Sequence, residues 1–375
     1  MNVLHVTLSF AHGGRRQAIA ALCRALVPLG VENRLCCLEN FESTPAERAS
    51  CFVDSIELHR RNLLDRNAAR RLREYCFAHA IDIVHTHDAA SQAASAIALP
   101  LRRPPMLMTF HRTRNFESAR PRDRLRNALV GLRAGAVVTA SQERLLHYLR
   151  NNRVSSGKVT CIPLGVDLAR FRPDATLRSS RRAQLGIGAG QLLIGTIGHF
   201  GPEKGADLAI DAFQIFCEKH PDCDARLIVL GTGNDEQERF VRSRVSPEFS
   251  ARIHFAGFQP SPEEWLPAFD VLLHGARSEA FGLVLAEAMA CGVPIVATRV
   301  GGIPEIVDER SGVLAPTADA DALAIALDRA LTDPEWRGSA SQHALQRART
   351  HYCSEQYARR YFELYSSLVK SAAVA

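Results

Sequence analysis

Residues 278–294 read SEAFGLVLAEAMACGVP, and this stretch is the most informative part of the chain. Glu279 and Glu287 lie eight residues apart, with a small-residue turn beside the first and a helical pattern around the second. If the helix begins near Gly282, its unpaired N–H groups and the positive end of its dipole lie between the two carboxylates. Eight helical residues rise about 12 Å, the length scale of a nucleoside diphosphate sugar with its phosphates at the helix start. The stretch predicts an anion site between two hydroxyl-binding carboxylates; the alternative is two surface charges on an amphipathic helix.

Outward from this segment, short apolar runs alternate with amphipathic stretches in both directions, which is typical of strand–helix crossovers and parallel sheets. The nearest is a buried strand within residues 292–298, directly behind the helix. We expect the strands of the whole chain near residues 3–8, 32–38, 55–58, 83–85, 106–110, 136–139, 159–162, 192–197, 226–230, 253–255, 271–273 and 295–297. We expect helices near residues 15–29, 66–79, 122–132, 142–150, 206–219, 236–244, 263–269, 282–291 and 320–331, with helical pattern again from 335 to about 368.

The composition is that of a globular protein of about two domains, with 375 residues, 46% of them hydrophobic and 23% charged. No apolar stretch approaches the roughly 20 residues that a membrane helix needs. The N-terminus lacks a basic leader and a cleavage site, so we expect a cytoplasmic protein. The ten cysteines form no CxxC pair, and we expect them to be reduced and mostly buried.

Several of these segments together resemble glycosyltransferase family 4, whose members are retaining enzymes with the GT-B fold. Residues 278–294 are similar to the E-x7-E signature of that family, and the resemblance covers nearly the whole chain. The other matching segments are His85-Thr86-His87 for an HxH strand end, Thr109-Phe110-His111 for the catalytic-histidine segment, residues 162–173 for the NGVD..F.P linker, residues 198–205 for the phosphate loop, and residues 301–305 for the loop after the next strand.

The resemblance implies an α/β protein with two Rossmann-like, doubly wound domains that face each other across a cleft. The linker, with its prolines and glycine, falls between the two series of strands. We expect an acceptor-binding domain over residues 1–168, a nucleotide-sugar donor domain over residues 169–352, and a C-terminal helix over residues 353–375 that crosses back to the N-terminal domain.

The resemblance also implies roles for individual residues. Glu279 would hold hydroxyls of the donor sugar and Glu287 the ribose, both as ionised acceptors. Lys204 would neutralise the departing diphosphate, and His111 would contact the sugar near the reacting carbon. The catalytic candidates are therefore His111, Lys204 and Glu279. The donor-binding candidates are Gly13, Gly14, His199, Phe281, Gly282, Leu283 and Glu287.

The chain departs from the family pattern at three places. His199 stands where an arginine is usual in the phosphate loop, Arg15 and Arg16 follow the Gly13-Gly14 turn where an acidic residue is common, and residue 112 after the catalytic histidine is an arginine. We expect Arg15 or Arg16 to replace the missing phosphate-loop cation.

We expect no metal ion and no cofactor besides the nucleotide-sugar co-substrate. His85 and His87 lie one residue apart on a strand and would suggest a metal only if other ligands converged, and none is obvious. We therefore expect them to be structural, with His87 a possible acceptor-side contact. Asp319-Ala-Asp321 has the letters of a metal-binding DxD motif, but it begins a helical pattern, where we expect an N-cap.

The resulting hypothesis is a metal-independent, retaining α-glycosyltransferase. It would move a sugar from a nucleotide-diphosphate donor to a hydroxyl of a glycan or lipid-linked acceptor, in polysaccharide or lipopolysaccharide biosynthesis. Two alternatives remain open: a nucleotide-sugar 2-epimerase, which would form product from the donor alone, and a non-catalytic nucleotide-sugar-binding protein of the same fold.

Charge is distributed unevenly along the chain. Residues 1–170 contain 25 Arg and Lys against 14 Asp and Glu, whereas the remainder contains 21 against 26. Much of the excess lies in the arginine-rich stretch of residues 112–126. We therefore expect the N-terminal domain to meet an anionic membrane surface or a phosphorylated glycan, as an enzyme peripheral to the inner membrane face would. The alternative is a solvated helix face. No nucleic-acid partner is expected.

Overall fold

The computed structural model describes residues 1–11, 13–62, 64–100, 104–111, 131, 133–152, 154–188 and 190–374. The chain forms two compact units. Unit 1 comprises Met1–Gly165 together with Ser354–Ala375, and unit 2 comprises Val166–Cys353. The arginine-rich stretch of residues 112–126 and most of the helix expected over residues 122–132 lie outside the described residues.

Unit 1 is built on a parallel sheet whose described strands follow the order β3-β2-β1-β4-β5-β6-β7. Along β2, alternate side chains face opposite sides of the sheet. Leu35 and Cys37 pack toward α1 (Gly14–Leu26), whereas Cys36 and Leu38 pack toward α3 (Arg66–Ala78) and α4 (Ala89–Ala98). The strands are β1 (Asn2–Thr7), β2 (Glu32–Cys37), β3 (Asp54–Glu57), β4 (Ile83–Thr86), β5 (Met106–Phe110), β6 (Ala134–Thr139) and β7 (Val159–Cys161).

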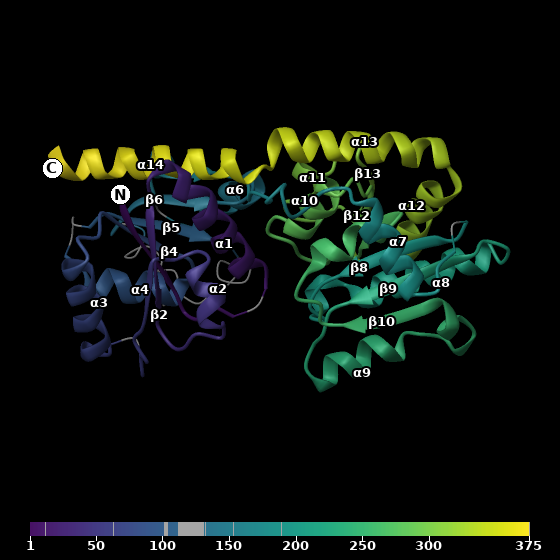
Figure 1. The fold of residues 1–375 in the computed structure, drawn as a ribbon, viewed down its shortest axis with the longest axis horizontal. Helices are drawn as coiled ribbons and strands as arrows, with labels where there is room; N and C mark the ends of the chain where they lie inside the picture. The colour runs from purple at the N-terminus through teal and green to yellow at the C-terminus, as the bar shows by residue number, and fades with distance from the viewer. Residues whose placement is uncertain are drawn as a thin grey trace. The chain divides into compact units, whose positions relative to one another are not determined.

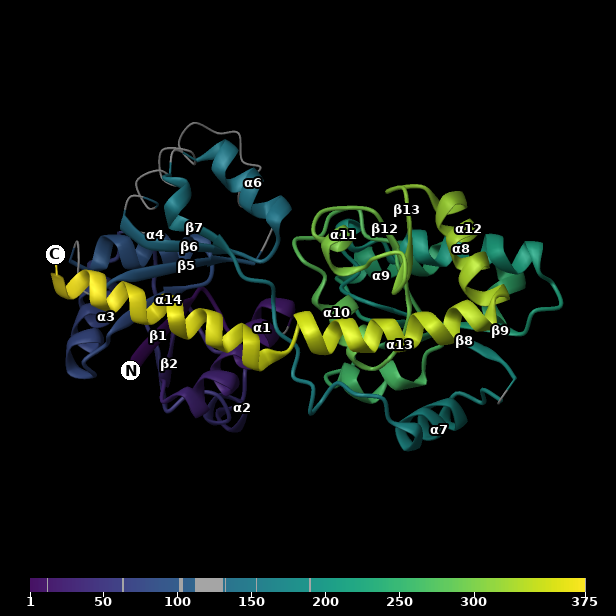
Figure 2. The same cartoon turned by 90° about the horizontal axis from the view of Figure 1, so that it is seen from above.

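The helices of unit 1 cover both faces of this sheet, and the last of them comes from the C-terminus. Figures 1 and 2 show α14 running along the sheet beside α1. The expected return of a C-terminal helix to the N-terminal domain is therefore confirmed. The helices are α1 (Gly14–Leu26), α2 (Pro45–Ala49), α3 (Arg66–Ala78), α4 (Ala89–Ala98), α6 (Gln142–Asn151) and α14 (Ser354–Val374), with short 3-10 turns η1 (Val27–Leu29) and η2 (Ser156–Lys158).

Two tyrosines on one face of α14 hold it to the sheet. They lie four residues apart and so project from the same side of the helix. The hydroxyl of Tyr365 lies 2.7 Å from His85 Nδ1, and that of Tyr361 lies 2.9 Å from Thr109 Oγ1. His85 Nε2 lies 2.7 Å from the same threonine oxygen, so the buried polar groups are joined in one network.

Unit 2 contains a second parallel sheet, with described strands in the order β10-β9-β8-β11-β12-β13. In both units the first strand in sequence lies in the middle of the sheet and the strands that follow it extend the sheet on either side, as in a doubly wound fold. The strands are β8 (Leu192–Ile197), β9 (Ala225–Leu230), β10 (Ile253–Gly257), β11 (Val271–His274), β12 (Ile295–Thr298) and β13 (Gly312–Ala315).

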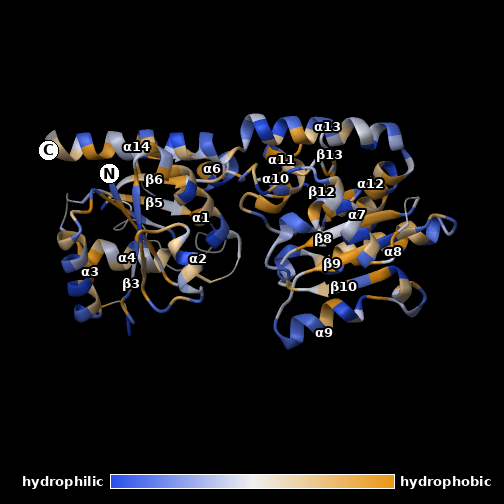
Figure 3. Ribbon diagram, in the orientation of Figure 1, coloured by the Kyte–Doolittle hydropathy of each residue, from blue (hydrophilic) through white to orange (hydrophobic). Residues whose placement is uncertain are grey.

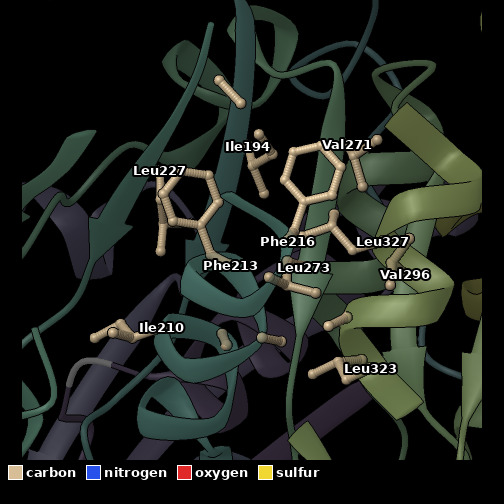
Figure 4. Close-up of a cluster of buried hydrophobic side chains, with 14 of the residues drawn as sticks. Ile194, Ile210, Phe213, Phe216, Leu227, Val271, Leu273, Val296, Leu323 and Leu327 are labelled. Carbon is tan, nitrogen blue, oxygen red and sulfur yellow. The ribbon is translucent and has the colours of Figure 1, made fainter. Parts of the chain in front are cut away.

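A large apolar cluster of unit 2 lies between the sheet and two helices. Phe213 and Phe216 of α8 (Ala206–Lys219) and Leu323 and Leu327 of α12 (Ala320–Thr332) pack against strand residues such as Val271 (Figure 4). The strands are predominantly hydrophobic, whereas α13 is largely hydrophilic along its length (Figure 3). The helices are α7 (Ala175–Gln184), α8 (Ala206–Lys219), α9 (Asp235–Ser243), α10 (Leu283–Ala290), α11 (Ile303–Ile306), α12 (Ala320–Thr332) and α13 (Pro334–His351), with 3-10 turns η3 (Pro202–Lys204), η4 (Pro247–Arg252), η5 (Pro262–Glu264) and η6 (Leu266–Ala268).

Some sequence expectations were wrong in detail. The helix expected over residues 263–269 is the pair of 3-10 turns η5 and η6, because Pro262 begins η5 and Pro267, the second residue of η6, has no N–H to continue a helix. Strand β13 and helices α7 and α11 were not expected, and α2 and α4 were not among the helices named between the strands of unit 1. Asp319 does cap α12, since its side chain accepts a hydrogen bond from the N–H of Ala322.

All ten cysteines are free thiols, and seven of them are buried. Among the described helices, none is both long enough and apolar enough to cross a bilayer.

The tyrosine contacts of α14 predict a measurable loss of stability. Tyr365→Phe removes the hydroxyl beside the buried His85 Nδ1 and should lower the free energy of unfolding by about 1–3 kcal/mol. Denaturant titration of the full chain measures this change. Ser367→Ala, at an exposed position on the same helix, serves as the control. Equal unfolding midpoints for Tyr365→Phe and the wild type would contradict the anchoring role.

Candidate active site

The site in unit 2 begins with the turn that carries Lys204. Strand β8 ends at Ile197, and the chain then enters the short turn η3, which closes at Gly205 with a φ of +63°. A Cβ at Gly205 would lie 1.8 Å from the carbonyl oxygen of Gly275, so only glycine permits this approach of the two loops. The loop after β8 is thereby held directly against the loop after β11.

Arg277 joins the same two loops. Its guanidinium contacts both carboxylate oxygens of Asp207, at 2.9 and 2.6 Å, and donates to the carbonyl of Pro202 at 2.9 Å. The backbone N–H groups of Arg277 and Ser278 donate to the carbonyl of Glu203 at 2.9 and 3.2 Å. A bidentate pair of this kind is rigid as well as strong. Arg277 therefore fixes the turn that ends at Lys204.

Glu279 lies between two nitrogen groups. Its Oε2 is 2.7 Å from Lys204 Nζ and 3.5 Å from His274 Nε2. Burial alone would raise the pKa of this carboxyl, but His274 and Lys204 together lower its pKa to about 2. Glu279 is thus an ionised acceptor, as expected from the sequence.

The loop after β12 covers the backbone of Glu279. Gly302 N–H donates to the carbonyl of Glu279 at 3.2 Å. Gly301 has a φ of +54°, and a Cβ there would lie 1.8 Å from the same carbonyl oxygen. The carboxylate is therefore positioned through its backbone as well as through its side-chain partners.

Helix α10 begins immediately beyond Glu279. Gly282 is its N-cap with a φ of +100°, and Phe281 before it is buried with its ring 5.8 Å from that of Tyr352. Among the described residues, no hydrogen-bond acceptor is found for the backbone N–H groups of Gly282, Leu283 or Val284. The start of α10 thus has the unpaired donors that an anion requires.

Glu287 lies within α10 and is 7% exposed. Burial raises its pKa to about 8, with Glu263 adding to the shift and Arg170 opposing it. Arg170 pairs with Glu263 at 2.6 Å. Burial thus favours the protonated form of Glu287 in the chain without ligand, and a protonated carboxyl can both donate and accept a hydrogen bond. The expected role of Glu287 as an ionised acceptor for a ribose stays a prediction.

His199 is exposed in the loop after β8 and bends back on that loop. Its Nδ1 accepts a hydrogen bond from the backbone N–H of Gly201 at 2.9 Å. That nitrogen must be unprotonated to accept, so only Nε2 can carry a proton toward a ligand.

The remaining candidates lie in unit 1. Gly13 is the N-cap of α1, with a φ of +134°, and Gly14 is its first residue. Arg15 lies 3.5 Å from Asp88, and Arg16 pairs with Glu47 at 2.5 Å. The expected role of either arginine toward a phosphate therefore stays a prediction.

His111 and His87 lie at the carboxyl ends of neighbouring strands of unit 1. His111 Nε2 is 3.1 Å from His87 Nδ1. Contrary to the expectation that no further ligand converges, the structure brings His5 to His85 and His87, with one ligand atom of each within 4.8 Å of the others. This trio is the candidate metal-ligand set, although both ring nitrogens of all three histidines already have hydrogen-bond partners.

Sequence reasoning missed His274, Arg277 and Asp207. The available signal was position alone, since His274 ends a buried strand and Arg277 lies two residues before Glu279 in the loop that follows. Their partners are 5 and 70 residues away in sequence, and only the fold brings the second pair together.

Comparison with known proteins identifies the family. The profile of "Glycosyltransferase Family 4" matches residues 12–170, and that of "Glycosyl transferases group 1" matches residues 178–347. A D-inositol 3-phosphate glycosyltransferase from Jonesia denitrificans is 30% identical over 74% of this chain and 70% of its own length. The chain belongs to glycosyltransferase family 4.

Other family 4 relatives and a solved structure agree with this assignment. The lipopolysaccharide core biosynthesis mannosyltransferase LpsB of Rhizobium meliloti is 30% identical over 56% of this chain and 61% of its own. The chain spans about two thirds of the length of such relatives. The crystal structure of Anabaena HepE in complex with UDP and glucose superposes with a TM-score of 0.83 over 98% of this chain and all of that one, at 19% identity, and shows that the fold is GT-B.

The contacts of Arg277 predict that weakening its pair with Asp207 makes the turn that carries Lys204 less rigid. Arg277→Lys keeps the charge but loses the planar two-point contact, because an ammonium group cannot bridge both carboxylate oxygens in the same way. Hydrogen exchange followed by mass spectrometry should show faster exchange of the amides at residues 277 and 278. The exposed Arg299→Lys is the control. Unchanged exchange in Arg277→Lys would contradict this role.

Glu287 predicts a pH dependence of stability. Because the pKa of Glu287 is raised to about 8 in the folded chain, its stabilising contribution is complete below the ordinary pKa of 4.5 and is lost as pH rises toward 8. Glu287→Gln cannot lose a proton, so the free energy of unfolding of the wild type should fall relative to the variant by up to about 1.4 kcal/mol per pH unit within that window.

Denaturant titrations at several pH values measure this difference, and Glu236→Gln at an exposed position is the matched control. Parallel pH profiles for the wild type and Glu287→Gln would show that Glu287 is ionised in the folded chain.

Proposed function

We propose that the protein is a retaining, metal-independent α-glycosyltransferase. It transfers a sugar from a nucleotide-diphosphate sugar to a hydroxyl of a glycan or lipid-linked acceptor in the assembly of cell-surface polysaccharide or lipopolysaccharide. The observation that carries the proposal is the 2.7 Å pairing of Glu279 with Lys204 next to the unpaired N–H groups of α10.

Charge complementarity supports a diphosphate at this position. Lys204 has three N–H donors and uses one toward Glu279, so its ammonium can contact a phosphate while it keeps the carboxylate in place. The N-terminus of α10 adds backbone donors and a partial positive charge. Glu279, held ionised, accepts hydrogen bonds from sugar hydroxyls, and the protonated Glu287 can serve the hydroxyl pair of a ribose.

The proposed reaction is a displacement at the anomeric carbon. The acceptor oxygen forms a bond to that carbon on the face from which the diphosphate departs, and the bond to the phosphate oxygen breaks. The acceptor proton passes to the departing phosphate oxygen, so no side-chain base is needed. Lys204 and the amides of α10 stabilise the charge that develops on the leaving group, and His111 contacts the sugar near the reacting carbon.

The relatives support the substrate class. LpsB is a mannosyltransferase of lipopolysaccharide core biosynthesis, and the HepE crystal structure contains UDP and glucose. We include in the proposal an anionic membrane face or phosphorylated glycan on the acceptor side, at the inner face of the membrane. Its support is the surplus of Arg and Lys over Asp and Glu in residues 1–170.

Activity assays of two variants test the proposal. Nucleotide sugars such as UDP-glucose and GDP-mannose are first screened for thermal stabilisation of the full chain, and release of the nucleoside diphosphate is then measured with a panel of glycan acceptors. Lys204→Ala and Glu279→Ala should each lower kcat by about 10²–10³-fold, the usual cost of removing one preorganised electrostatic group. Lys219→Ala, an exposed lysine of the same unit, should leave kcat unchanged.

The same assays separate the alternatives. Wild-type rates in Lys204→Ala and Glu279→Ala would refute the site, and product formed from the donor alone would identify an epimerase. Nucleotide-sugar binding without turnover on any acceptor would favour a non-catalytic role. The anomeric configuration of the product, read by NMR, tests retention, and loss of activity in a chelator would contradict metal independence.

A further inference from the structure

A row of polar side chains crosses four neighbouring strands of unit 1 and ends at His111. Strands β2, β1, β4 and β5 lie side by side in that order. Asn33 lies near the start of β2, His5 lies within β1, and His87 and His111 directly follow β4 and β5. The row therefore runs diagonally from the interior of the sheet to its carboxyl edge.

Consecutive members of this row are within hydrogen-bonding distance. Asn33 Oδ1 is 3.1 Å from His5 Nε2, and His5 Nδ1 is 3.0 Å from His87 Nε2. His87 Nδ1 is 3.1 Å from His111 Nε2. At the far end, His111 Nδ1 has no hydrogen-bond partner among the residues that the structure describes. Asn33, His5 and His87 are all almost completely buried.

The amide of Asn33 sets the direction of the first hydrogen bond. Its Nδ2 donates to the carbonyl of Cys23 at 3.0 Å, so its Oδ1 faces His5. An amide oxygen only accepts, and therefore His5 Nε2 must carry the proton. The thiol sulfur of Cys23, 3.4 Å from the same nitrogen, is compatible with this because sulfur is a weak acceptor.

The direction then passes along the row, because a neutral imidazole has one N–H and one acceptor nitrogen. His5 Nδ1 accepts from His87 Nε2–H, and His87 Nδ1 accepts from His111 Nε2–H. Burial keeps the rings neutral: it lowers the pKa of His5 to about 4 and holds the pKa of His87 well below the usual range. Burial, with a further contribution from Arg15, lowers the pKa of His111 to about 3, although Asp88 opposes the shift.

The opposite direction of the hydrogen bonds along the row is disfavoured at both ends of the row. It would place an acceptor nitrogen of His5 against Asn33 Oδ1, and turning the amide over would place that oxygen against the carbonyl of Cys23. It would also leave an N–H on His111 Nδ1, which is buried and has no acceptor among the described residues. Each such mismatch in a buried network costs on the order of 1–3 kcal/mol.

We propose that Asn33, His5 and His87 are positioning residues that fix the tautomer of His111, so that its Nδ1 presents a lone pair as a hydrogen-bond acceptor for a sugar hydroxyl. The identity of the hydroxyl rests on the proposed function; the tautomer does not. In this state His111 accepts a hydrogen bond from the sugar hydroxyl and carries no charge. This agrees with a role in orienting the substrate rather than in removing a proton.

The alternative role for these rings is to bind a metal ion through His5, His85 and His87. It would require His85 to give up Tyr365 or Thr109, and His5 and His87 each to give up one of their hydrogen-bond contacts. Because each of these nitrogens already has a partner suited to it, the hydrogen-bonded row is the better description of the cluster.

Histidine nitrogen NMR on the full chain tests the proposal directly. In protein labelled with ¹⁵N-histidine, long-range ¹H–¹⁵N correlations should show His5, His87 and His111 as neutral tautomers protonated at Nε2, assigned by loss of each signal on substitution. A His111 ring protonated at Nδ1 in the wild type would overturn the proposal. Zinc retained after dialysis, with shifted signals of His5 and His87, would overturn it in favour of the metal.

Two variants at the start of the row extend the test. Asn33→Asp, protonated at this buried position, keeps an acceptor beside His5 and a donor toward the carbonyl of Cys23, so it should preserve the tautomer of His111. Asn33→Leu removes that acceptor and should give a mixture of His111 tautomers, with kcat/KM lower by roughly three- to tenfold, the equivalent of one neutral hydrogen bond. Asn67→Leu, on the exposed face of α3, is the control.

The outcomes separate this inference from the proposed function. A wild-type spectrum with the stated tautomers and no glycosyl transfer would refute the function and leave the hydrogen-bond order standing. Active enzyme whose His111 tautomer is the same in Asn33→Leu as in the wild type would refute the positioning role and leave the function standing.

Discussion

The ion pair between Glu279 and Lys204 is the constraint on which the site in unit 2 depends. The two residues lie on loops that follow different strands, and they meet only because the backbones of those loops touch at Gly205 and Gly275. A buried carboxylate without such a partner would take up a proton. The close backbone packing and the charged state of Glu279 are therefore two aspects of the same arrangement.

Most of the fold could be predicted from the sequence, because buried parallel strands appear as short apolar runs between amphipathic helices. The missed elements lack those signals. Helix α4 consists mainly of alanine and serine, so no row of large apolar side chains marks its buried face, and β13 begins with a glycine and is followed directly by a proline. The prolines at positions 262 and 267 divide what otherwise resembles a helix, and the apolar pattern alone does not show this.

The site was less predictable than the fold. The spacing of Glu279 and Glu287 indicated an anion site, and the family resemblance placed Lys204 beside it. The protonation of Glu287 could not be predicted, because its pKa depends on burial by the folded chain. The Arg277–Asp207 pair and the row that ends at His111 join residues from separate strands and loops, and no local pattern encodes such contacts.

The position of α14 has a consequence for biosynthesis. Unit 2 is one continuous segment, whereas unit 1 needs both the first 165 residues and the last helix. On the ribosome, unit 2 can therefore complete its fold as soon as it emerges. Unit 1 stays incomplete until α14 is made, because Thr109 and His85 still lack their tyrosine partners. Unit 1, although its synthesis starts first, is thus completed after unit 2, and a chain that stops before Ser354 would leave unit 1, rather than unit 2, unfinished.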